Sequence, residues 1–306
     1  TWAPRAPEVI ALTSITYADE GVIIDADIGF NAVDWQFTLG DDDVQVDFIS
    51  IAVHEIGHYL GLDHSDDDAA TMFAQYNPGE VGLRTLTDDD RAGLAALYPC
   101  ARAPCLGDVG PGCSVVRQLA PRGLALLAFL GLVVLAGVRR RGTSAAVLLG
   151  GALLLIPGAS TGSVVQSLDV DALGERADVI VRATVSEVAP YEARRVRSEI
   201  TLDVQESWKG LAPDTVVLDQ PGGRLPHLGT VVFGMPRFEA GAEVVVFLRW
   251  PEGGEPQVLG LAQGKFDVRG EGVSRDLTGL ALAGADAATA KSMPGGLTEL
   301  RARIER

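Results

Sequence analysis

The sequence is poor in histidine, cysteine and basic residues. Of its 306 residues only 4 are His and 3 are Cys, and 25 Lys/Arg stand against 41 Asp/Glu. The shortage of positive charge is greatest in residues 1–99, which hold 19 Asp/Glu and 3 Lys/Arg. Proteins that bind nucleic acid need Lys and Arg to displace counterions from the phosphates, so this composition argues against nucleic acid as a partner.

The three cysteines, Cys100, Cys105 and Cys113, lie close together and form no CxxC pair. An oxidising compartment allows a Cys100–Cys105 disulfide that leaves Cys113 free or modified. Three cysteines are too few to define the compartment.

Charge divides the chain into three zones. Residues 100–162 are basic, with 6 Arg and 1 Asp, and residues 163–306 hold 21 acidic and 16 basic residues. A chain of this length has room for two domains, and its 47% hydrophobic content excludes wholesale disorder. Because the first residue is Thr rather than Met, we expect a fragment or a processed product.

The first zone carries the signals of an α+β fold. Residues 9–17 and 22–30 alternate apolar and polar side chains around the turn ADEG, which predicts a β-hairpin. Apolar residues then recur with helical spacing over 48–60. An irregular, Gly/Pro-punctuated stretch follows at 65–82. Thr87 and the three acids after it predict the start of a second helix.

The stretch HEIGHYLGLDHS on the first predicted helix contains three of the four histidines. His54 and His58 are four residues apart, so they share one face of the helix. Gly61 allows a left-handed turn that returns His64 to the same point, and Glu55 can reach a water there without ligating a metal. Three nitrogen ligands and one open position are typical of catalytic zinc. Histidines that merely lie on the surface of an amphipathic helix are the alternative, but five fixed positions seldom coincide by chance.

This stretch resembles the HExxHxxGxxH signature of the metzincin metallopeptidases, and the Ser after the third His resembles the matrixin branch. The resemblance implies that His54, His58 and His64 ligate zinc and that Glu55 is the general base. It also implies that Met72 is the Met-turn residue, which packs beneath the metal rather than taking part in chemistry.

Sequence around the motif extends the likeness. IIDADIGFNAVDW resembles the matrixin strand before the active-site helix, and LTDDDRAGLAALYP resembles the helix that closes the domain. The resemblance covers residues 1–99 and implies the C-terminal half of a metzincin-like catalytic domain. In that family an extended peptide pairs along the sheet edge that corresponds to residues 10–17. Asp25, Asp27 and Asp41–Asp43 are candidates for structural calcium, with solvated surface turns as the alternative.

Two uncharged apolar runs, 123–138 and 144–159, flank Arg139–Arg141. We predict that 119–160 forms two transmembrane helices, with the arginines on the cytoplasmic side and both flanking domains outside. The second run also resembles a secretory signal peptide, so a sorting tail followed by an internal signal, as in a fusion of two exported proteins, is an alternative. A buried core helix is a third interpretation.

Residues 100–118, rich in Cys, Gly and Pro, are predicted to form a linker. Gly112-Cys113-Ser114, followed by an apolar span and the Arg cluster, resembles the tripartite sorting tails of bacterial envelope proteins. That resemblance implies lipidation or sorting at Cys113, with an ordinary linker cysteine as the alternative.

Residues 163–306 contain β-branched runs separated by Gly and Pro, which predict a mainly-β domain in the form of a small barrel or sandwich. The predicted strands are 178–188, 199–204, 215–218, 243–248 and 257–268, with helices at about 168–176 and 297–305. This zone resembles β-rich exported bacterial domains of undefined role, and its one histidine, His227, has no neighbours that indicate chemistry.

These features together predict an envelope-associated, zinc-dependent metalloendopeptidase that hydrolyses peptide bonds by a metal-activated water with Glu55 as base. The expected partners are a protein or peptide substrate and a membrane, at an extracytoplasmic location, membrane-anchored, on the cell surface or secreted. A matrixin domain normally has an opening strand, a long helix and further strands where only 53 residues precede His54 here. The alternative is therefore a catalytically inactive zinc-binding or adhesion module whose function resides in the β-rich domain.

Overall fold

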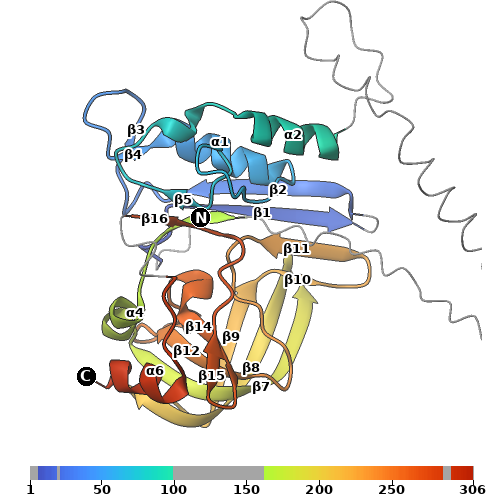
Figure 1. The fold of residues 1–306 in the computed structure, drawn as a ribbon. Helices are drawn as coiled ribbons and strands as arrows, with labels where there is room; N and C mark the ends of the chain where they lie inside the picture. Colours follow the sequence, from blue (N-terminus) through green and yellow to red (C-terminus); the bar gives the residue numbers. More distant parts are fainter. Residues whose placement is uncertain (1–5, 19–20, 99–161, 285–290, 306) are drawn as a thin grey trace, which may run out of the picture. The chain divides into compact units, whose positions relative to one another are not determined.

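The computed structural model describes residues 6–18, 21–98, 162–284 and 291–305. They form a mixed α+β fold in which segments from both ends of the chain belong to one compact unit (Figure 1). The predicted transmembrane segments of 119–160 and the candidate Cys113 lie outside the described residues. In the part of the chain that is described, no helix is both long and apolar enough to cross a bilayer.

The predicted hairpin and both helices of the first zone are confirmed. β1 (Ala11–Ala18) and β2 (Ile23–Phe30) pair antiparallel, and α1 (Phe48–Tyr59) packs against both strands. α1 begins at Asp47, whose carboxylate accepts the Ser50 N–H at 2.8 Å. This cap satisfies one of the amides that a helix leaves without an internal partner, and so fixes where the helix begins.

The second helix, α2 (Asp88–Leu97), follows the Thr87 cap as predicted, and its first three residues are acidic. The Thr87 hydroxyl oxygen accepts the Asp90 N–H at 3.4 Å. The shorter elements of this zone are β3 (Phe37–Thr38), β4 (Val46–Asp47), β5 (Gln75–Tyr76) and the 3-10 helix η2 (Gly82–Arg84).

The last zone is built on a seven-stranded antiparallel sheet. In spatial order the strands are β15 (Gly272–Ser274), β14 (Lys265–Arg269), β12 (Glu243–Arg249), β7 (Val179–Glu192), β8 (Val196–Lys209) and β9 (Thr215–Pro221), with β13 (Gln257–Val258) beside β12. The run predicted as one strand, 257–268, is divided by the 3-10 helix η5 (Leu261–Gly264).

The sheet is open, so the predicted barrel is wrong: β15 and β9 are its two edges and do not pair with each other. Two helices, α4 (Val170–Arg176) and α6 (Leu297–Ile304), pack their apolar side chains on one face of the sheet together with Phe247 and Phe266. Because these helices bury that face, the sheet forms a core without closing on itself.

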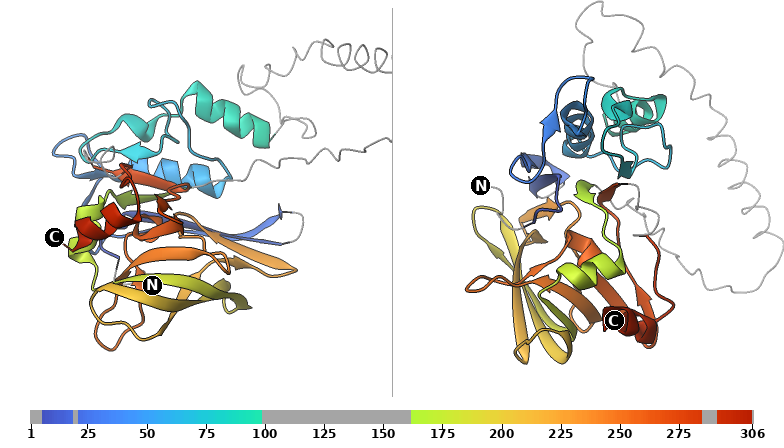
Figure 2. Two further views of the ribbon diagram at one scale, coloured as in Figure 1. Left: turned by 60° about the horizontal axis from the view of Figure 1, so that its bottom comes forward. Right: turned by 90° about the vertical axis from the view of Figure 1, so that its left-hand side faces the viewer.

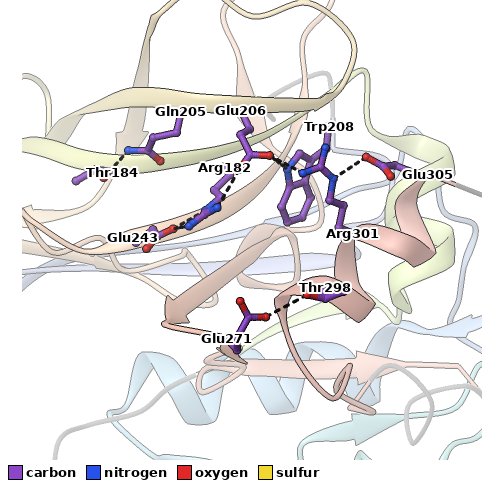
Figure 3. A network of polar contacts seen from close by, with 10 residues as sticks. All are labelled: Arg182, Thr184, Gln205, Glu206, Trp208, Glu243, Glu271, Thr298, Arg301 and Glu305. Carbon is purple, nitrogen blue, oxygen red and sulfur yellow. Dashed lines mark hydrogen bonds and ion pairs between the residues drawn. The ribbon is translucent and has the colours of Figure 1, made fainter.

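A polar network ties α6 to this sheet (Figure 3). Arg182 on β7 forms ion pairs with Glu206 on β8 and Glu243 on β12. Glu206 also accepts a hydrogen bond from Arg301 on α6 at 2.6 Å, and Arg301 pairs with Glu305 on the same helix. The network joins three strands and a helix through charge-assisted hydrogen bonds.

Two further sheets join the last zone to the first, and none of the strands that the last zone contributes to them was predicted. β11 (Leu228–Val232) pairs antiparallel with β1, and β10 (Gly223–Arg224) continues that sheet (Figure 1). β16 (Leu280–Ala283) lies between β5 and β6 (Ser163–Gln166) and is parallel to both. Figure 2 shows the same unit from two other sides.

Candidate metal centre and active site

Three histidine side chains converge beside α1. His54 and His58 lie one turn apart on the helix with their Nε2 atoms 2.9 Å from each other, and both are buried. The chain leaves the helix through Gly61 at φ +89°, in the left-handed region that favours glycine. That turn returns His64, whose Nε2 lies 3.3 Å from His54 Nε2. Among the described residues these three form the group that could hold a metal ion.

Backbone carbonyls orient the two helical imidazoles. His54 Nδ1 lies 2.8 Å from the carbonyl oxygen of Thr71, and His58 Nδ1 lies 3.0 Å from that of Leu62. When each Nδ1–H donates to its carbonyl, the Nε2 lone pair is left for a metal, as metal-ligating histidines require.

Burial keeps the histidines neutral. It lowers the pKa of His54 to about 4, although the bond to Thr71 opposes the shift. It lowers the pKa of His64 to about 3, with further lowering by His54 and Lys291, and it holds the pKa of His58 well below its usual value. Neutral imidazole is the form that ligates metals.

The donor set fits zinc. Ligands about 2.0–2.1 Å from a tetrahedral zinc stand roughly 3.4 Å from one another, close to the 2.9 and 3.3 Å between the Nε2 atoms. Three imidazoles supply three of the four ligands, the number found in catalytic rather than structural zinc sites. In this structure the backbone of Gly162 lies against the His58 and His64 Nε2 atoms, on the side where a fourth ligand would bind. A cavity of about 370 Å³ lies beside His64 and is lined in part by Asp63, His64 and Lys291.

Glu55 lies on the same helix with a fully buried carboxylate. Its Oε2 accepts a hydrogen bond from the Thr13 hydroxyl on β1, and its Oε1 lies 3.3 Å from the Val164 N–H on β6. Burial raises the pKa of Glu55 to about 8, although both hydrogen bonds act in the opposite direction. Thr13 was not identified from the sequence, where only the alternation of β1 indicates that its side chain faces inward.

Met72 is buried, and its thioether packs against α1 so closely that a Cβ on Gly57 would overlap its sulfur. The carboxylate of Asp90 holds this turn by accepting the backbone N–H groups of Thr71 and Met72, each at 3.0 Å. Sequence reasoning treated Asp90 only as an acid at a helix start. The structure gives it a second role, because Thr71 in turn orients His54.

Three of the five residues considered for calcium form ion pairs with arginines. Asp25 and Asp27 form ion pairs with Arg195, and Asp41 pairs with Arg84. In the described parts of the chain, no acidic side chains gather into a group that could hold a metal. His227 is exposed and lies 3.5 Å from Glu192.

The edge of β1, which the resemblance assigned to an extended peptide, is occupied. β11 pairs with residues 14–18 of β1, and β6 is bonded to residues 8–10 just before it. Sequence alone gave no signal of this, because the partners are short strands far along the chain.

Residues 13–99 match the model of the matrixin family, and this stretch includes the three converging histidines. Matrix metalloproteinase-2 of Drosophila melanogaster is 45% identical over 65 residues, which cover 21% of this chain and 8% of that protein. Metalloendoproteinase 1-MMP of Arabidopsis thaliana is 46% identical over 59 residues, 19% of this chain and 16% of that protein. Matrilysin of Rattus norvegicus is 40% identical over 63 residues, 21% of this chain and 24% of that protein. The chain thus spans no more than about a quarter of these relatives.

Proposed function

We propose that the chain is a zinc-dependent metalloendopeptidase whose active site consists of His54, His58, His64 and Glu55. The observation that carries the proposal is the convergence of three neutral imidazole nitrogens, with a carboxylate one residue after the first of them. The matrixin match over residues 13–99 supports the same class of reaction.

His54, His58 and His64 would hold the zinc ion through their Nε2 atoms. Bound zinc supplies Lewis acidity, which polarises the scissile carbonyl and lowers the pKa of water toward about 7. Glu55 takes the proton of the attacking water as the new C–O bond forms, and delivers it to the amine nitrogen as the C–N bond breaks. Thr13 fixes the Glu55 carboxylate and favours its ionised form by donating to it.

A nearby divalent cation also lowers the pKa of Glu55, because positive charge favours the carboxylate. The hydrogen bonds from Thr13 and Val164 act in the same direction, so both they and a bound metal would favour the ionised form that serves as the base.

Glu55→Gln tests the assignment, with Glu80→Gln, in the loop after β5, as the matched control. We expect both variants to retain one zinc per chain by elemental analysis, because neither removes a ligand. Hydrolysis of a fluorogenic peptide should fall by about 10²–10⁴-fold in Glu55→Gln and stay unchanged in the control. Hydrolysis by Glu55→Gln at the rate of the unaltered protein would contradict the role of the base.

We further propose that the enzyme is extracytoplasmic and attached to the cell envelope. The support is in the sequence, where the apolar runs 123–138 and 144–159 flank three arginines. Membrane fractionation of cells that produce the full chain tests this. Recovery of the whole protein in the cytoplasmic fraction would exclude it.

A further inference from the structure

The last zone bonds to residues 8–10 and 13–18, along the edge of β1 on which an extended peptide was expected to pair. Before β1, the Gln166 N–H donates to the Glu8 carbonyl at 2.6 Å and the Ile10 N–H donates to the Val164 carbonyl at 2.9 Å. Further along, the Phe233 N–H donates to the Thr13 carbonyl at 3.1 Å, and β11 then pairs up to the end of β1. A peptide cannot add to this edge while these bonds are made.

The same segment enters the catalytic centre. The Val164 N–H is directed at Glu55 Oε1, the carboxylate oxygen that Thr13 does not engage. Two residues earlier, Gly162 lies against the histidines, where a Cβ built on it would stand 2.7 Å from His58 Nε2 and still closer to His64 Nε2. A side chain at this position would overlap the His64 and His58 imidazoles unless the segment or a ring moved.

The last zone also covers the side of the site that lies away from β1, through β16. β16 lies between β6 and β5, with the Leu282 N–H donating to the Ala74 carbonyl at 3.2 Å and the Gly284 N–H to the Tyr76 carbonyl at 3.0 Å. β6 and β16 together therefore occupy the space between the edge of β1 and the segment that follows Met72.

We call the segments of the last zone that lie over the site, β6, β11 and β16, the cover. Side-chain contacts hold the cover in place at three points. The Phe233 ring packs on His58 with 5.8 Å between ring centroids. Arg195 pairs with Asp25 and Asp27 of β2, on the other side of β1. The fully buried carboxylate of Glu8 accepts bonds from Arg249 at 3.1 Å and from the Gly260 N–H at 2.9 Å. Of these contacts the Glu8 carboxylate is the buried one, and its charge-assisted hydrogen bonds are stronger than bonds between neutral groups.

We propose that residues 163–306 are an inhibitor of the peptidase site in the same chain, with Gly162–Gln166 as the blocking segment. This inference rests on the proposed peptidase function. The segment blocks by occupying both the edge of β1 and the free side of Glu55. The β-rich zone thereby acquires a function that its sequence does not reveal.

Gly162→Leu in the full chain tests the proposal, with Gly174→Leu as the matched control, because a side chain at Gly174 meets no atom within 4 Å. The leucine cannot fit against the histidines, so the segment must leave its position. We expect peptide hydrolysis by the zinc-loaded protein and amide exchange of Ile10 to rise about tenfold or more in Gly162→Leu, and neither to change in Gly174→Leu. A chelator should also withdraw zinc faster from Gly162→Leu, since its site is no longer covered.

Arg195→Ala provides a second variant on the surface, which weakens the cover without touching the core. A gain of about two- to threefold in hydrolysis is expected, because a partly exposed ion pair contributes little. Equal hydrolysis by the unaltered protein and both variants would overturn the inhibitory role. Cleavage of the unaltered chain within 162–166 would also overturn it, because the segment would then be a substrate. A third outcome is that zinc binds and Ile10 exchanges faster in Gly162→Leu, but no variant hydrolyses the peptide. That result would overturn the peptidase function, and inhibition with it. It would still show that the segment covers the site.

Discussion

The Asp90 carboxylate shows how one side chain beyond the motif supports the metal centre. It accepts the backbone N–H groups of Thr71, Met72 and Thr87. Burial alone would raise the pKa of Asp90, but these bonds outweigh burial and the pKa lies below its usual value. The ionised form is therefore the one that the folded protein stabilises.

Asp90→Asn should lower the free energy of unfolding at pH 7 by about 1–3 kcal/mol, because the amide group leaves a buried N–H without an acceptor. Because the pKa of Asp90 is lower in the folded protein, its contribution is present above the ordinary value of 3.8 and is lost as the pH falls through the lowered pKa. Urea unfolding at pH 7 and pH 3 measures this. A difference between the two proteins that does not shrink at all from pH 7 to pH 3 would contradict the ionic origin.

Residue-level reasoning identified His54, His58, His64 and Glu55 because their spacing along one helix and turn is a local property. The contact between Thr13 and Glu55 could not be predicted in this way, since the two residues are 42 positions apart in the sequence. A threonine in an alternating strand has no local signal that separates it from any other inward-facing polar residue.

At the scale of elements, the structure bears out those that local rules define. β1, β2 and α1 follow from periodicity, and α2 from its cap. β6, β11 and β16 are short, and they are strands only because distant segments pair with them. Gly260, at φ +66°, interrupts the run that was predicted as one strand.

The turn after α1 allows a test at this scale, because Gly61 adopts φ +89°. Gly61→Ala should weaken zinc binding by about tenfold, since a Cβ disfavours the left-handed conformation by about 1–2 kcal/mol and the turn positions His64. Gly82→Ala, at an open position, is the control. Competition with a fluorescent zinc chelator gives both affinities, and equal values would show that the turn does not set the position of His64.

At the scale of the whole molecule, zinc and folding should be coupled. A ligand that binds only the folded state stabilises it by mass action, about 2.7 kcal/mol at a hundred times its dissociation constant. We expect a chelator to lower the melting temperature, and zinc to restore it. His58→Ala should show neither effect in the same thermal scan. A melting temperature that chelation leaves unchanged in the unaltered protein would contradict zinc as a resident metal.

The predictions for whole domains were confirmed only in part. The matrixin match covers residues 13–99, as the sequence likeness indicated. The open sheet replaces the expected barrel because α4 and α6 bury one of its faces. The antiparallel pairing of β1 with β11 could not be predicted from the sequence, since Ser14 and Val232 lie more than two hundred positions apart.

β1 and the strands bonded to its edge belong to one polypeptide. A separate peptide must therefore compete with a covalently tethered partner for the edge of β1. A tethered partner acts at an effective concentration that is commonly on the order of millimolar. If residues 163–306 inhibit the site as proposed, a protein substrate at micromolar concentration loses that competition for as long as the chain between the two parts is whole. A cut between the two parts would remove the advantage of the tether, and hydrolysis would then be expected to rise.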